Sequence, residues 1–148
     1  MLISDRIAIG SDHAGYKLKT HVKSVLDAMG IAYDDLGAAS LDPADDYPIF
    51  AARVARGVSE GKYARGIAMC GSGIGASIAA NRFRGVRAAL CVTPEMATMS
   101  RLHNDSNVLV MGERITPEPV ADEILRTWLT VATEGGRHSK RVQLLDEV

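Results

Sequence analysis

Short apolar runs alternate with longer amphipathic segments along the whole chain. The apolar runs have the length and composition of buried strands and lie at residues 6–10, 31–36, 66–69, 86–92 and 107–111. The amphipathic segments carry apolar side chains at helical spacing and lie at residues 14–29, 48–60, 74–82, 94–102, 116–131 and 138–145. Strands that alternate with helices predict a five-stranded parallel sheet covered by helices on both faces. We therefore expect a doubly wound, three-layer α/β fold of the Rossmann-like type.

Glycine and proline residues mark where the predicted helices begin and end. Gly30 is a stop signal for the first helix, and Pro94 and Pro117 suit the first turns of two later helices. The pair Gly135-Gly136 separates the last helical segment from the rest of the chain. No repeat, low-complexity tract or second domain interrupts the pattern. Residues 1–148 are therefore expected to form a single domain with a C-terminal helical arm from about residue 135.

Composition and charge narrow the class of protein. A chain of 148 residues is too short for two full nucleotide-binding halves. The formal net charge of −1 and the charged fraction of 24% argue against general nucleic-acid binding. No apolar stretch approaches the roughly 20 residues needed to cross a bilayer, and the sequence carries no secretory signal. Cys70 and Cys91 are therefore expected to be reduced thiols in a soluble cytoplasmic protein with no membrane partner.

A glycine-rich turn directly follows the third predicted strand, with the sequence Cys70-Gly71-Ser72-Gly73-Ile74-Gly75. This context places a thiol at the end of a strand and at the start of a helix. Backbone N–H groups and the positive end of the helix stabilise negative charge at such a place, either on the thiolate or on a bound anion. The thiol, the nearby hydroxyl and the free amides would then supply a base, a proton shuttle and an anion cradle.

Other uses of this turn fit less well. A dinucleotide site matches Gly71, Gly73 and Ala76, but it needs an acidic residue about 20 positions further on, where the chain has an apolar run. A cysteine phosphatase needs arginine at position 76, and a disulfide oxidoreductase needs cysteine at position 73; neither is present. The remaining alternative is a buried, inert Cys70 beside glycines that serve only helix packing.

Further polar residues lie near the ends of predicted strands. Asp12 and His13 follow the first strand, Arg114 follows the last, and His103 and Asn104 lie in the loop before it. Because the carboxyl ends of parallel strands meet at one edge of the sheet, these clusters could converge with the glycine-rich turn on one pocket.

The C-terminal arm concentrates positive charge. Arg137 and Arg141 have the spacing of one helix face, and His138 lies beside them. Such a group is either a solvated basic helix start or a phosphate clamp. Histidine and carboxylate spacing nowhere resembles a metal-ligand set, so no metal is expected.

With these residues in view, the chain resembles the ribose-5-phosphate isomerases of the B type, a family that includes allose-, galactose- and tetrose-phosphate isomerases. The resemblance spans essentially the whole chain. Its motifs are Gly10-Ser11-Asp12-His13-Ala14-Gly15, Asp46-Tyr47-Pro48, the turn at 70–75, Ala79-Ala80-Asn81, His103-Asn104-Asp105-Ser106-Asn107-Val108-Leu109 and Gly135-Gly136-Arg137-His138. One branch of the family uses a cysteine base before the turn, and another uses a glutamate at its end. Here these positions hold Cys70 and Ala76, which matches the cysteine branch.

The resemblance implies an aldose–ketose isomerase that interconverts ribose 5-phosphate and ribulose 5-phosphate through a cis-enediolate, as in the pentose phosphate pathway. By resemblance, His103 opens the sugar ring with Asp12 as its helper, and Cys70 moves the proton between C2 and C1. Ser72 would pass a proton between O1 and O2. The backbone amides of the turn would hold the enediolate, so neither a metal nor an organic cofactor is required. The amides are those of residues 71–75, and the residues expected to bind the substrate through them are Gly71, Gly73, Ile74 and Gly75.

The same resemblance implies how the substrate is held. Tyr47 and Asn104 would contact sugar hydroxyls. In the family the C-terminal arm crosses a two-fold axis, so part of the phosphate clamp comes from the partner. This implies a homodimer, which in the family is sometimes paired further into a tetramer. The clamp residues would be His13, Arg114, Arg137, His138 and Arg141.

Two alternatives to this function remain at the level of sequence. One is an isomerase for a tetrose 4-phosphate or a hexose 6-phosphate, since substrate length depends on the distance between the clamp and the thiolate. The other is a sugar-phosphate binding protein without turnover. The joint presence of Cys70, Ser72, His103 and the two arginines of the arm argues against a mere binder.

Overall fold

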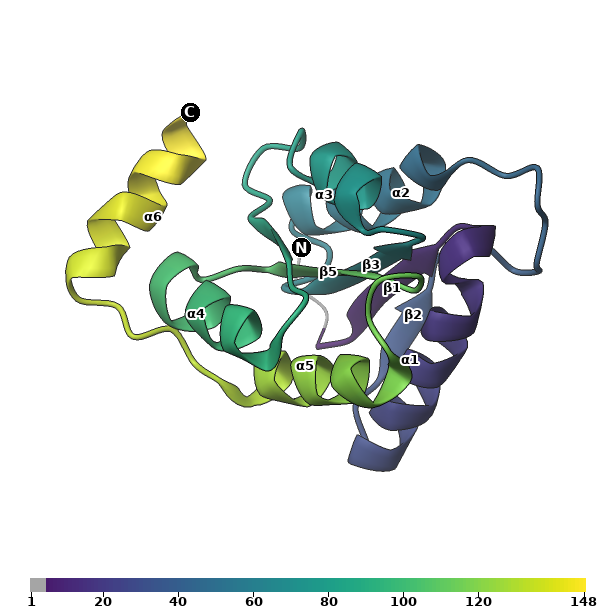
Figure 1. Cartoon of the computed structure of the whole chain (residues 1–148). Helices are drawn as coiled ribbons and strands as arrows, with labels where there is room; N and C mark the ends of the chain where they lie inside the picture. The colour runs from purple at the N-terminus through teal and green to yellow at the C-terminus, as the bar shows by residue number, and fades with distance from the viewer. Residues whose placement is uncertain (1–4) are drawn as a thin grey trace.

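The computed structural model describes residues 5–148 and has a single parallel sheet with the strand order β2-β1-β3-β5-β4 (Figure 1). The three central strands are buried along their whole length, whereas the two edge strands are shorter and partly exposed. The strands are β1 (Ile7–Ser11), β2 (Tyr33–Asp35), β3 (Gly66–Cys70), β4 (Ala88–Leu90) and β5 (Val108–Gly112).

Helices cover both faces of this sheet, which confirms the predicted doubly wound α/β fold. Two helices pack on one face, three on the other, and the last helix stands outside both layers (Figure 1). The helices are α1 (Tyr16–Met29), α2 (Tyr47–Ser59), α3 (Ile74–Ala80), α4 (Pro94–Asn104), α5 (Glu118–Thr130) and α6 (Arg137–Glu147), with a short 3₁₀ helix η1 (His13–Gly15). Helices α2 and α3 share one face, and α1, α4 and α5 share the other. Within residues 5–148, no helix is long and apolar enough to span a membrane.

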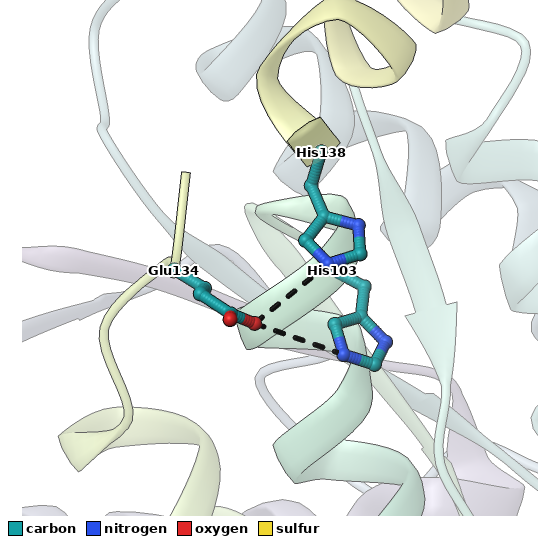
Figure 2. Close-up of side chains that lie close together, drawn as sticks. All are labelled: His103, Glu134 and His138. Atoms are coloured by element: carbon teal, nitrogen blue, oxygen red, sulfur yellow. Dashed lines mark ion pairs between the residues drawn. The ribbon is translucent and has the colours of Figure 1, made fainter. Parts of the chain in front are cut away.

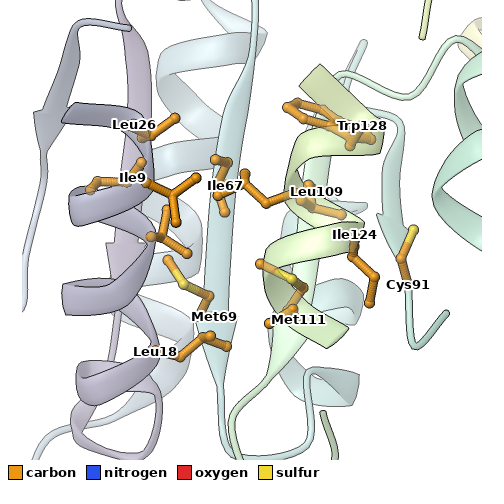
Figure 3. Close-up of a cluster of buried hydrophobic side chains, with 14 of the residues drawn as sticks. Ile9, Leu18, Leu26, Ile67, Met69, Cys91, Leu109, Met111, Ile124 and Trp128 are labelled. Atoms are coloured by element: carbon orange, nitrogen blue, oxygen red, sulfur yellow. The ribbon is translucent and has the colours of Figure 1, made fainter. Parts of the chain in front are cut away.

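The hydrophobic core consists of two clusters, one on each face of the sheet. Alternate residues of a strand point to opposite faces, so Ile9 joins the larger cluster and Ala8 joins the smaller one. The larger cluster contains Ile9 of β1, Leu26 of α1 and the fully buried Trp128 of α5 (Figure 3). Burial of these large side chains against the central strands supplies the main stabilisation of the fold.

The two cysteines belong to different clusters. Cys91 lies in the larger cluster and Cys70 in the smaller one, on opposite faces of the sheet, and both thiols are free. Burial raises the pKa of Cys91 to about 11, so this thiol stays protonated at neutral pH. Cys70 is therefore the candidate for thiol chemistry.

Two segments differ in detail from the sequence prediction. The helix expected to end near residue 102 continues to Asn104, so His103 and Asn104 lie on its last turn and not in a loop. Asp105 ends the helix with a left-handed backbone (φ 45°), a conformation that aspartate tolerates better than most residues. The strand expected over 86–92 is limited to β4, whose three residues pair with β5 at the edge of the sheet.

The C-terminal arm begins after Gly135 and Gly136, which both adopt positive φ values of 70° and 57°. Helix α6 then packs against α4 and stands apart from the sheet (Figure 1). A helical arm was predicted here, and α6 confirms its helical structure.

Candidate active site

The order of the strands reverses beside β1, because β2 pairs with one side of β1 and β3 with the other. In doubly wound folds, ligands bind outside the carboxyl ends of strands at such a point. A pocket of about 530 Å³ lies there. It is lined by Asp12, His13, Ala14, Tyr47, Cys70, Gly71, Ser72, Ile74, Gly75, Ile78, Arg114 and Ile115.

The glycine-rich turn folds back over the thiol that precedes it. The backbone N–H of Gly73 donates to Cys70 Sγ at 3.2 Å, and the N–H of Ile74 donates to Ser72 Oγ at 3.2 Å. A backbone donor aimed at sulfur stabilises negative charge there. The predicted juxtaposition of a thiol, a hydroxyl and main-chain amides is therefore present within one turn at the pocket wall.

Gly73 has to be glycine for two reasons. It caps the N-terminus of α3 with a φ of 80°, a left-handed conformation that side chains disfavour. A Cβ at this position would also lie 2.5 Å from Leu90 Cδ1 and 3.1 Å from the carbonyl carbon of Met111. The turn thus depends on the absence of a side chain.

Replacement of Gly73 by alanine is expected to lower the free energy of unfolding by about 2–4 kcal/mol, because it combines backbone strain with a steric clash. Gly85 is a matched control, since its φ is 78° and a Cβ there would meet nothing within 4 Å. Gly85→Ala should cost only the backbone strain, about 1–2 kcal/mol. Urea unfolding of both variants checks this, and equal losses would remove the clash from the explanation.

Asp12 is buried at the carboxyl end of β1, where its Oδ1 accepts a hydrogen bond from the N–H of Gly15 at 3.1 Å. Burial raises the pKa of this carboxyl, and the hydrogen bond from Gly15 opposes part of that shift. A carboxyl with a raised pKa can give and take protons nearer to neutral pH than an ordinary aspartate.

His13 is held by a residue that the sequence did not single out. Asp45 Oδ1 lies 2.6 Å from His13 Nδ1 and accepts the backbone N–H of His13 at 2.9 Å. This hydrogen bond is the main reason that the pKa of His13 is raised above its usual value. Asp45 comes from the polar loop between β2 and α2, 32 residues further along the chain. It has this role only because the fold brings that loop against His13.

Tyr47 and Arg114 close over the glycine-rich turn from two sides. A Cβ on Gly75 would lie 2.3 Å from Tyr47 Cε1, so the tyrosine ring rests directly on the backbone there. A Cβ on Gly71 would lie 3.1 Å from Arg114 Nη1, which places the guanidinium beside the start of the turn. Arg114 and His13 give this end of the pocket its positive charge.

The remaining predicted residues lie elsewhere. His103 and His138 stack with ring centroids 4.4 Å apart, and Glu134 Oε2 lies 4.0 Å and 3.7 Å from their Nε2 atoms (Figure 2). We call these three residues the His103 cluster. His138 is buried, and this burial, together with the neighbouring His103, lowers its pKa. Neither histidine lines the pocket, nor do Asn104, Arg137 and Arg141.

Two groups of side chains bring possible metal-binding atoms within 4.8 Å of one another. In the His103 cluster, however, the two rings are nearly parallel, with an interplanar angle of 23°. The Nε2 atoms of both rings lie at ion-pair distance from Glu134 Oε2. In the second group, which comprises Asp12, His13 and Asp45, Nδ1 of the histidine is already hydrogen-bonded to Asp45. Both arrangements fit ion pairing better than metal coordination.

The fold and the pocket together define an α/β protein with a pocket at the carboxyl edge of a parallel sheet, lined by a thiol, a glycine-rich turn and the side chains of His13 and Arg114. The model of the ribose/galactose isomerase family matches residues 7–145, and the chain belongs to this family. The predicted resemblance is confirmed.

Individual relatives match over nearly their full length. Ribose-5-phosphate isomerase B of Escherichia coli is 42% identical over 97% of this chain and 95% of its own. A D-erythrulose-4-phosphate isomerase of Pectobacterium atrosepticum is 36% identical over 93% of this chain and 90% of its own. The crystal structure of ribose-5-phosphate isomerase B from Mycoplasma genitalium, with bound ribulose 5-phosphate, superimposes with a TM-score of 0.93 at 36% identity and covers 98% of this chain and 96% of that one.

Proposed function

We propose that this chain interconverts ribose 5-phosphate and ribulose 5-phosphate, with Cys70 as the base. The observation that carries the proposal is the hydrogen bond from the Gly73 amide to Cys70 Sγ, in a pocket that also holds His13 and Arg114. A nucleophilic sulfur, main-chain donors and a cationic end are what a phosphorylated sugar needs for proton transfer at carbon. The family and the names of its members agree with this reaction.

In the proposed mechanism, the Cys70 thiolate removes the proton from C2 of the open-chain aldose. The C–H electrons form the C1–C2 double bond, and negative charge collects on O1, where the amides of residues 71–75 face it. Ser72 transfers the proton of O2 to O1, and Cys70 returns its own proton to C1 to give the ketose. Loss of one such amide donor typically costs about 10²–10³ in rate, which indicates the size of their contribution.

Ring opening and part of the phosphate clamp would come from a second copy of the chain. The pocket lacks His103, Asn104 and the two arginines of α6, all of which lie on the α4–α6 side of the molecule (Figure 1). For these side chains to reach the same substrate, a partner subunit has to present them. We therefore propose a homodimer with two composite sites, which could pair further into a tetramer. Its free thiols fit the reducing cytoplasm, where the pentose phosphate pathway operates.

The arm arginines supply a test of the clamp. Arg137 and Arg141 are both exposed on α6, available to a phosphate on the partner. Replacement of both by alanine is expected to raise KM for ribose 5-phosphate by about 10–100-fold, since each charge-assisted hydrogen bond is lost. Lys140→Ala removes a neighbouring exposed charge and should leave KM nearly unchanged. Steady-state kinetics measures KM for both variants. Equal increases in KM would mean that the arm attracts the substrate by general electrostatics and that the two arginines do not clamp the phosphate.

A second candidate function differs from the first in the length of the sugar phosphate. The relative from Pectobacterium atrosepticum is named for a four-carbon substrate at 36% identity, so the family accommodates more than one chain length. An allose- or galactose-type hexose 6-phosphate is the other alternative, and a non-catalytic sugar-phosphate binder is the third. In each isomerase, the same thiol would act and only the distance from thiol to phosphate would differ.

Proton NMR of ribose 5-phosphate in deuterated buffer with a catalytic amount of the protein tests the proposal. We expect ribulose 5-phosphate signals to appear, with deuterium at the transferred position wherever the base exchanges with solvent. Conversion of a tetrose 4-phosphate or a hexose 6-phosphate alone would transfer the function to that substrate. No conversion of any of them, with tight binding, would identify a binding protein.

A further inference from the structure

Asp45 reaches the active site without lining its pocket. Its side chain is only 10% exposed, and one oxygen, Oδ1, contacts both the ring Nδ1 (2.6 Å) and the backbone N–H (2.9 Å) of His13. A single carboxylate thus fixes the main chain and the ring of the same residue. These two contacts attach the polar loop that carries Asp45 to this end of the pocket.

The hydrogen bond determines which nitrogen of His13 is left for a ligand. An ionised carboxylate only accepts hydrogen bonds, so Nδ1 carries the hydrogen and Nε2 remains available. The surroundings of the ring shift the pKa of His13 in opposite directions. Asp45 raises the pKa of His13 most, Asp12 adds to the rise, and burial and Arg114 oppose it. The balance favours the imidazolium ion.

We propose that Asp45 is a positioning residue that holds His13 as a cation, with Nε2 presented to the phosphate group of the substrate. The inference rests on the proposed function. A phosphate monoester becomes a dianion near pH 6, and an ordinary histidine loses its charge near pH 6.5, so the two charged forms would overlap only narrowly. By retaining the proton on His13, Asp45 extends this overlap to higher pH.

Asp45→Asn tests the charge alone, because asparagine keeps an acceptor oxygen of the same reach. Above its midpoint, the cationic fraction of a histidine falls about tenfold per pH unit. In the variant, KM for ribose 5-phosphate should therefore climb by up to about tenfold per unit from near pH 6.5, whereas in the wild type the climb begins at higher pH. The value of kcat should change little. Asp45→Glu restores the charge and should partly restore the wild-type profile.

Asp42→Asn is the matched control. Asp42 is exposed on the same loop, and its Oδ1 accepts the N–H of Ala44, a bond that asparagine preserves. This variant removes the same charge from the loop without touching His13, so its pH profile should follow the wild type. Equal pH profiles for the Asp42 and Asp45 variants would overturn the proposal.

A readout independent of turnover separates this inference from the proposed function. NMR titration of the His13 ring, assigned with His13→Gln, should show a midpoint at lower pH in Asp45→Asn than in the wild type. Inorganic phosphate should bind the wild type more tightly than the variant at pH 8. An active enzyme with an unshifted His13 midpoint would refute the role of Asp45. A shifted midpoint and weakened phosphate binding in a protein without isomerase activity would leave that role standing and overturn the proposed function.

Discussion

Cys70→Ala is expected to lower kcat by about 10²–10⁴-fold, because the substitution removes the proposed base that takes the C2 proton. The fold should survive, since alanine is smaller than the buried cysteine and Cys70 lies at the end of its strand. Binding of ribose 5-phosphate should stay within a few-fold of wild type, because His13 and Arg114 are unaffected. Isotope exchange at C2 and calorimetric binding measure the two effects separately.

The other cysteine provides the control. Cys91 is buried on the opposite face of the sheet, and its raised pKa keeps it a neutral thiol. Cys91→Ala should therefore leave kcat unchanged at the cost of some stability. Near-normal turnover in Cys70→Ala would require another base and would refute the assigned mechanism.

Two inactive variants are expected to restore activity when they share a dimer. Cys70→Ala and His103→Ala would each lack one part of the proposed composite site, but a mixed dimer would hold one site in which both residues are present. Random pairing makes half of the dimers mixed, each with one intact site of two, so co-expressed chains should recover about one quarter of the wild-type activity. The expectation follows from the proposed dimer, because His103 does not line the pocket of its own chain.

The matching control replaces the His103→Ala partner by a chain that carries both substitutions. No pairing of that chain with Cys70→Ala yields a complete site, so activity should stay at background. Recovery only in the first mixture would establish sites shared between subunits. Absence of recovery in both, with mixed dimers verified by mass spectrometry, would place Cys70 and His103 in one chain's site.

Much of the fold could be predicted because its signals are local. The buried runs of β1, β3 and β5 and the helical spacing between them each lie within about 16 residues, and the glycine-rich turn is contiguous. The ends of these strands were expected to converge, and Asp12, Cys70 and Arg114 do line one pocket. The prediction was least accurate for the edge strand β4, because its partly exposed residues leave a weaker apolar pattern.

The features that the sequence did not predict depend on contacts between distant segments. Asp45 lies in an irregular loop, and nothing in its neighbours indicates that it meets His13. Glu134 is likewise an ordinary exposed carboxylate until the fold places it beside two histidines (Figure 2). An aspartate or glutamate in a polar stretch has the same appearance whether it is solvated or holds a catalytic ring, so only the tertiary structure distinguishes them.

The anion cradle that we propose at residues 71–75 would be built from main-chain donors. Every amino acid except proline carries the same N–H group, so substitutions in the turn cannot delete its chemistry one donor at a time. Natural selection there acts on size and backbone conformation, as Gly73 and Gly75 illustrate through their close neighbours. At Cys70, the proposed base, natural selection acts on the reactivity of the side chain. A lineage can thus exchange its base while it inherits the anion cradle intact.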